Sequence, residues 1–226
     1  MRRQFEEAEG ELKNKILSMG SLAEEMIHSA IQGLAERKRE PLQKVTTNED
    51  EVNRLHIDID NRCVNLIALH QPAATDLRFI IAAIKINSDL ERIGDQAVNI
   101  SQTAALLLDH PQLEKKLLNI PRMTELAQSM FKDSLDSFVK KDVALARTVL
   151  ARDAEEDQLK SEAFNELMQL MQSDASTIQR ALGLILIARN LERIADHATN
   201  IAEDVIFMTL GKDIRHHAEG VKDANS

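Results

Sequence analysis

Apolar residues recur at intervals of three and four along most of the chain, which is the spacing of amphipathic helices. In the first such stretch they include Leu12, Ile16 and Met26, and the pattern ends near Arg39, just before Pro41. Because a proline disfavours helical backbone angles in the residue before it, we predict that a long first helix stops here.

Five further helices are predicted on the same grounds, with prolines, glycines and capping residues at their ends. The second helix ends at about Gln71, and the third runs from Ala73 to His110. Pro121 opens the fourth, and the Lys140–Asp142 stretch leads into a fifth that continues through Met171. The sixth helix is capped by Asp174 or Ser176 and runs to about Leu210, with Gly211 as its C′ residue.

The composition supports a helical protein and opposes a sheet. The chain has six Phe, no Trp, no Tyr and four Pro in 226 residues, so the aromatic composition typical of strands is missing. Long helices joined by short loops pack as antiparallel neighbours. We therefore predict an all-α fold of two tandem, pseudo-twofold-related three-helix bundles with six long helices. The first bundle takes residues 1–112, and the second takes residues 113–226 with a frayed tail.

A thirteen-residue segment occurs twice and implies a duplicated polar site. DLERIGDQAVNIS at 89–101 returns as NLERIADHATNIA at 190–202, with eight of thirteen positions identical. Four identical positions are polar, namely Glu91, Arg92, Asp95 and Asn99, matched by Glu192, Arg193, Asp196 and Asn200. Packing alone would keep hydrophobicity and leave polar identities free to change, so the repeat indicates a polar site built twice.

The acidic residues of each copy form a candidate metal site. Residues four apart share a helix face, and two carboxylates in that arrangement repel each other unless a cation compensates them. The preceding helix of each unit carries a matching pair of oxygen-bearing side chains. The predicted ligands are therefore Glu49, Asn53, Glu91 and Asp95 in the first unit, and Asp153, Asp157, Glu192 and Asp196 in the second. Asn99 and Asn200 continue the polar stripe. Such oxygen ligands suit Mg²⁺, Mn²⁺ or iron, with zinc also allowed. We expect tighter binding in the second unit, which has four carboxylates.

Two other interpretations of the acidic faces stay open. Each face could be a solvated charged surface with an Arg92–Asp95 ion pair, worth about 0.3–0.5 kcal/mol. It could also dock a partner's lysines and arginines with no metal. We interpret His28 as an ordinary helix residue. We interpret His216, His217 and His197 as surface residues, although His197 could serve as an outer metal ligand.

Several function classes are disfavoured by the sequence. A net charge of −9 repels a phosphodiester backbone, so we expect no direct nucleic-acid binding. The uncharged runs are far shorter than the roughly 20 residues that span a bilayer. No Gly-rich phosphate loop or nucleophile motif occurs. The single Cys63 and the polar N-terminal segment, which has no signal-peptide pattern, favour a reducing, cytoplasmic location.

The segment QPAATDLRFIIAAIKINSDLERIGDQAVNI at 71–100, with LERIADHATNIAED at 191–204, resembles the PhoU family of phosphate-transport regulators. The resemblance implies a pair of three-helix bundles that carry metal clusters, with iron or zinc as the ions, on paired E(D)xxxD motifs. These motifs correspond to the eight ligands named above, and Asn53 departs from the acidic pattern. Arg78, matched to the family's DLR element, is either a partner contact or part of a structural ion pair.

The resemblance also implies a function. The chain would be a cytoplasmic, dimeric, non-enzymatic negative regulator of the phosphate-starvation response. It would act between the ATPase side of the phosphate ABC transporter and the phosphate-sensing histidine kinase, associating with the membrane only through partners. The alternative is a multinuclear metal-dependent hydrolase on a helical scaffold, and a weaker third is a purely structural scaffold.

Overall fold

The computed structural model of the chain describes residues 2–113 and 119–214, which contain seven α-helices, one 3₁₀ turn and no strand. The helices are α1 (Arg2–Glu36), α2 (Arg39–His70), α3 (Ala74–Leu108), α4 (Asn119–Lys140), α5 (Val143–Ala151), α6 (Asp153–Ser173) and α7 (Ile178–Leu210). Among these residues no helix is both long and apolar enough to cross a bilayer.

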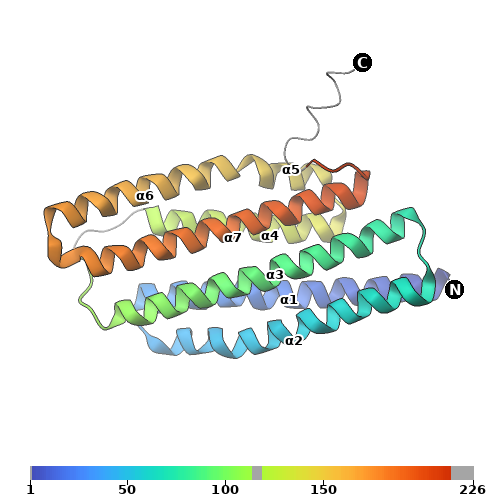
Figure 1. Cartoon of the computed structure of the whole chain (residues 1–226), viewed down its shortest axis with the longest axis horizontal. Helices are drawn as coiled ribbons and strands as arrows, with labels where there is room; N and C mark the ends of the chain where they lie inside the picture. The colour runs from blue at the N-terminus through green and yellow to red at the C-terminus, as the bar shows by residue number, and fades with distance from the viewer. Residues whose placement is uncertain (1, 114–118, 215–226) are drawn as a thin grey trace, which may run out of the picture.

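The helices form two groups that meet along α3 and α7 (Figure 1). Helices α1, α2 and α3 pack against one another on one side, and α4, α5 and α6 pack with α7 on the other. The all-α, duplicated fold predicted from the sequence is therefore confirmed. The division of the chain at residues 112 and 113 stays a prediction.

Helices α3 and α7 pack closely, and the repeated segment contributes buried apolar residues from both helices. Leu90 and Ile93 of α3 are fully buried, as are their repeat equivalents Leu191 and Ile194 of α7. A Cβ atom on Gly183 of α7 would lie only 2.8 Å from a methyl carbon of Leu107 on α3. One continuous hydrophobic core therefore crosses the boundary between the repeats.

The turn between α1 and α2 differs slightly from the prediction. Helix α2 already begins at Arg39, so Pro41 lies in its first turn, where a missing backbone N–H costs nothing. Arg37 adopts the left-handed conformation with φ of 55° and donates from Nη2 to the carbonyl oxygen of Leu108 at 3.0 Å. This contact ties the turn to the C-terminal end of α3, where carbonyl groups lack helical partners.

The predicted fifth helix is interrupted, and the expectation of one continuous helix was wrong at Arg152. This residue separates α5 from α6, and its Nη1 donates to Ser129 Oγ of α4 at 3.1 Å while its Nη2 pairs with Asp133. The interruption makes Asp153 the first residue of α6. The sixth predicted helix is α7; Asp174 caps the 3₁₀ turn before it by accepting from Ser176 N, and Gly211 ends it at φ of 69°.

Candidate metal centre

The second repeat brings its predicted ligands together between α6 and α7. Asp153 lies in the first turn of α6, and burial together with the charges of Asp157 and Glu192 raises the pKa of its carboxyl group. Burial, followed by the charges of Glu192 and Asp153, raises the pKa of Asp196 to about 6. Carboxylates that repel each other across two helices form a local excess of negative charge that a cation would relieve.

An ammonium group already lies inside this cluster. Lys160 Nζ is 2.7 Å from Glu192 Oε1 on α7 and 2.8 Å from Asp157 Oδ1 on its own helix. The hydrogen bonds that Lys160 donates to these two carboxylates raise its pKa, so the side chain carries its charge at neutral pH. Two of the four predicted ligands of the second repeat are therefore bridged by a lysine.

A fifth carboxylate, Glu156 on α6, was not predicted from the sequence. Its side chain is only 1% exposed, and neither carboxyl oxygen has a hydrogen-bond partner. Burial, and then the charge of Glu192, raises its pKa to about 8. Aligning Asp153 and Asp157 with Glu49 and Asn53 would have revealed it, because that alignment places Glu156 opposite the buried Val52.

The first repeat is arranged differently. Glu49 on α2 is close enough to Asp95 on α3 that burial and the charge of Asp95 raise its pKa. Asn53 is exposed and Glu91 is half-buried. The carboxylate excess of this repeat is therefore smaller than that of the second.

A further polar contact centres on Asp60, two to three turns beyond Asn53 and Glu49 along α2. There, Asn87 Nδ2 donates to Asp60 Oδ1 at 2.9 Å, and His56 Nε2 lies 3.8 Å from the other Asp60 oxygen. Asp60 is thus engaged by neighbours within its own repeat.

Within the described ranges, no three carboxylate, histidine or thiol side chains converge on one point as a ready-made metal site. The donors of the second repeat nevertheless fit a hard cation, because all of them are carboxylate oxygens and Glu156 is left without a partner. The eight metal ligands remain a prediction, with the second repeat as the better supported half.

One interpretation of the acidic faces was a solvated surface with an Arg92–Asp95 ion pair. Among the described residues, no ion pair within 4 Å joins Arg92 to Asp95. Both residues are exposed. Asn99 is exposed as well, and its carbonyl oxygen accepts a hydrogen bond from the Thr103 hydroxyl at 2.8 Å.

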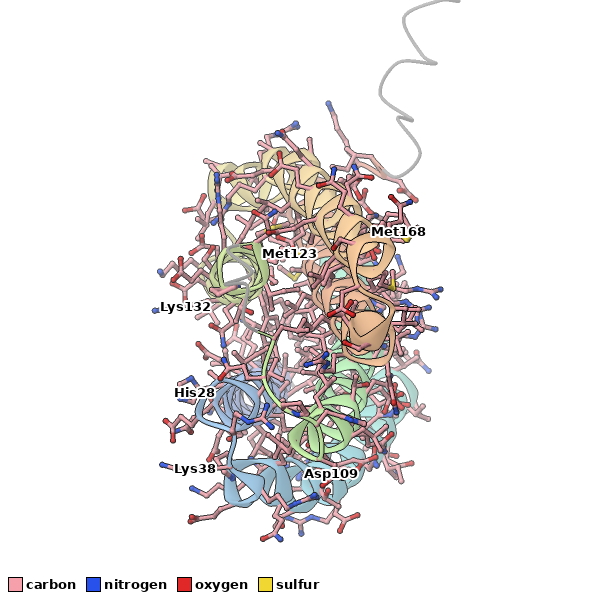
Figure 2. The ribbon with its side chains drawn as sticks, turned by 90° about the vertical axis from the view of Figure 1, so that its left-hand side faces the viewer. His28, Lys38, Asp109, Met123, Lys132 and Met168 are labelled. Carbon is pink, nitrogen blue, oxygen red and sulfur yellow. The ribbon has the colours of Figure 1, made fainter. Side chains whose placement is uncertain are left out.

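Two polar residues of the second copy face the first repeat. His197 Nδ1 lies 2.8 Å from Asp89 Oδ1 of α3, and the His197 side chain is only 13% exposed. Asn200 Nδ2 donates to the same oxygen at 3.2 Å. The expectation that His197 is a surface residue was wrong, because the close packing of α3 against α7 encloses it. By contrast, His28 does lie on the outer side of α1 (Figure 2).

The remaining candidate, Arg78, lies where the first turns of α3 meet the C-terminal end of α7. Its Nη2 is 3.5 Å from Thr75 Oγ1, and its guanidinium carbon would be 3.4 Å from a Cβ on Gly211 at the end of α7. Its two alternative roles stay open. His216, His217 and the predicted frayed tail lie outside the described residues.

A groove beside the cluster gives the second repeat a concave surface. It has a volume of about 580 Å³ and lies between α6 and α7. Its lining includes Lys160 and Glu192 of the cluster together with Phe164 and Arg189. The Phe164 side chain is 47% exposed there. The groove thus joins the acidic cluster to a surface that is apolar and basic.

These features define a class of protein: a duplicated all-helical molecule with acidic residues between α2 and α3 in one repeat and between α6 and α7 in the other. The PhoU domain family matches residues 16–104 and 120–205, one match in each repeat. The chain belongs to the PhoU family.

The similarity to individual members extends over nearly the whole chain. A phosphate-specific transport system accessory protein PhoU homolog of Aquifex aeolicus is 41% identical over 212 residues, covering 94% of this chain and 95% of the other. The homolog of Pseudomonas putida is 36% identical over 94% of this chain and 83% of its own.

Two solved structures share the fold. The crystal structure of PhoU from Pseudomonas aeruginosa matches with a TM-score of 0.89 and 35% identity, covering 92% of this chain and 100% of that one. The phosphate transport system regulatory protein PhoU from Streptococcus pneumoniae matches with a TM-score of 0.85 and 29% identity, covering 92% and 98%.

Proposed function

We propose that this protein is an accessory protein of a phosphate-specific transport system and a negative regulator of the phosphate-starvation response. The observation that carries the proposal is the family match in both repeats, with relatives named as phosphate-specific transport system accessory proteins aligned over 90% or more of the chain. In this proposal the protein works in the cytoplasm as a homodimer and is not an enzyme. It contacts the ATPase side of the phosphate ABC transporter and the phosphate-sensing histidine kinase, and holds the kinase inactive when phosphate is ample.

The charge of the molecule supports a docking role. A net charge of −9, concentrated in part on the acidic clusters, attracts basic surfaces and speeds association with them. A metal held by Asp153, Asp157, Glu192 and Asp196, or by Glu49, Asn53, Glu91 and Asp95, would neutralise part of this charge and fix the side chains that a partner meets. Metal content thus tunes the docking surface in this proposal.

Deletion of the gene tests the regulatory role. We expect a phosphate-responsive reporter to become active in phosphate-rich medium, and to be silenced again by the wild-type gene on a plasmid. Complementation with the Glu192→Ala/Asp196→Ala variant asks whether the second cluster takes part, with Lys132→Met, far from the cluster, as the control. Unchanged reporter expression on deletion would rule out the regulatory role.

The groove between α6 and α7 keeps one rival function worth testing, since a concave space beside carboxylates is what a metal-dependent hydrolase needs. Purified protein supplied with Mn²⁺, Zn²⁺ or Fe²⁺ would be assayed on a panel of phosphoesters. Turnover that disappears in the Glu192→Ala/Asp196→Ala variant would favour the hydrolase. Absence of turnover, together with binding to transporter or kinase, would favour the accessory role.

A further inference from the structure

Lys160 lies between two of the predicted metal ligands of the second repeat, one on α6 and one on α7. Its ammonium group contacts Asp157 and Glu192 at 2.8 and 2.7 Å, distances typical of charge-assisted hydrogen bonds. One contact is within α6 and the other crosses to α7. A divalent ion that used the same two carboxylates would therefore have to displace this ammonium group.

Glu156 provides a second, independent indication of a cation. A carboxylate that is 1% exposed and has no hydrogen-bond partner is rare in folded proteins, because burying it without a partner costs free energy. The charges that act most strongly on it are those of Glu192, Glu155, Asp153 and Asp157, so it belongs to the same acidic cluster that Lys160 enters. Lys160 bonds Asp157 and Glu192 and leaves both oxygens of Glu156 unpaired.

The first repeat lacks both features. Val52 stands at the position of Glu156, and His56 stands at the position of Lys160. Val52 is buried within the apolar core, as its side chain requires. The second repeat therefore carries two substitutions that change the charge at one place: a buried acid and a lysine.

We propose that the second repeat exchanges cations: Lys160 holds the cluster closed in the metal-free protein, and a divalent metal ion displaces it and recruits Glu156 as a ligand that the first repeat does not have. The inference rests on the acidic cluster being a metal site, as in the proposed function. Lys160 and Arg189 both line the groove of about 580 Å³. In this proposal the displaced ammonium group of Lys160 moves away from the carboxylates and into that groove. Metal binding thereby changes the charge of that groove.

The test uses the full chain without an affinity tag and Mn²⁺ as the probe, with binding followed by calorimetry and by the Mn²⁺ electron paramagnetic resonance signal. Lys160→Met removes the competing ammonium and is expected to tighten Mn²⁺ binding by roughly tenfold, since two charge-assisted contacts no longer have to be broken. Glu156→Val copies the first repeat and is expected to weaken binding by about ten- to a hundredfold.

Lys132→Met is the matched control. Lys132 is exposed and points outward from α4, on the opposite side of the molecule from Met168 of α6 (Figure 2). This variant loses the same charge and should bind Mn²⁺ as the wild type does. Glu156→Val should remain folded because valine is already the core residue at Val52 in the other repeat, and circular dichroism would verify this.

The outcomes separate the inference from the proposed function. Wild-type affinity in the Lys160→Met or Glu156→Val variant would overturn the exchange, and so would Mn²⁺ binding to none of these proteins. In either case, repression of the phosphate reporter by the wild type would leave the regulatory role intact. Shifted affinities in a protein that represses nothing would support the exchange and reject the regulatory role.

Discussion

Asp89 Oδ1 of α3 lies 2.8 Å from His197 Nδ1 of α7, across the boundary between the repeats. In the repeat alignment Asp89 corresponds to Asn190, and His197 corresponds to Gln96, so the related positions carry neutral amides. Gln96 is buried, and its Oε1 has no hydrogen-bond partner. The duplicated interface thus has an ionisable pair at one set of positions and amides at the related set. Its two halves are chemically different although the helices are related by pseudosymmetry.

The first prediction concerns this pair. Replacing Asp89 by Asn should lower the free energy of unfolding by about 1–2 kcal/mol, because the oxygen that contacts both His197 and Asn200 loses its charge. The Asp89→Asn/His197→Gln double variant reproduces the amides of the other half and should cost less than the sum of the single changes. Urea denaturation of all four proteins measures the coupling, and strictly additive losses would contradict it.

The second prediction concerns two glycines in α1. A Cβ on Gly33 would lie 2.3 Å from a methyl carbon of Leu42 and 3.1 Å from the Lys38 carbonyl oxygen, so Gly33→Ala should destabilise the protein by about 1–3 kcal/mol. Gly10 has nothing within 4 Å of the same position, so Gly10→Ala should stabilise the helix by up to about 1 kcal/mol. Thermal unfolding of both variants checks the contrast, and equal shifts would refute it.

The third prediction follows from the raised pKa of Glu156, which is about 8 in the folded protein against an ordinary value of 4.5. Between these values the folded state binds more protons than the unfolded state, so stability falls as pH rises from 5 to 8. The loss attributable to this group is on the order of 2–4 kcal/mol. Denaturation in buffer with a chelator should show this slope in the wild type and a flatter one in Glu156→Gln. Parallel slopes would show that Glu156 ionises freely in the fold.

The fourth prediction concerns metal content. Elemental analysis of untagged protein should show more metal lost in Glu192→Ala/Asp196→Ala than in Glu91→Ala/Asp95→Ala, because the second repeat has the larger carboxylate excess. A larger loss in the first-repeat variant would reverse the assignment of the tighter site. Absence of metal from the wild type would leave the acidic stripe as a docking or solvated surface.

The sequence was sufficient to predict most of the fold, because helix ends carry local signals. Gly211 and Asp174 act at the ends where the pattern placed them. The break at Arg152 escaped prediction because its cause is not local: the guanidinium is held by Ser129 and Asp133 of α4. Periodicity within one segment carries no information about such a contact.

The site was predicted less completely for a related reason. Spacing along a helix identified the acids at 153, 157, 192 and 196, but it could not show that Lys160 would bridge two of them. His197 was assigned to the surface since polar residues usually lie there, yet the packing of α3 against α7 encloses it. Contacts between helices decide both cases, and these depend on crossing geometry that one helix does not encode.

The break at Arg152 gives the two acidic clusters different backgrounds. Asp153, Glu155 and Glu156 fall in the first turn of α6, where the helix dipole is positive, whereas Glu49 lies in the interior of α2, which begins at Arg39. With Lys160 present in only one cluster, cation sites built on the two copies would have unequal affinities for the same ion. A single chain could thus register two concentrations of one cation, a graded signal that two identical copies could not give.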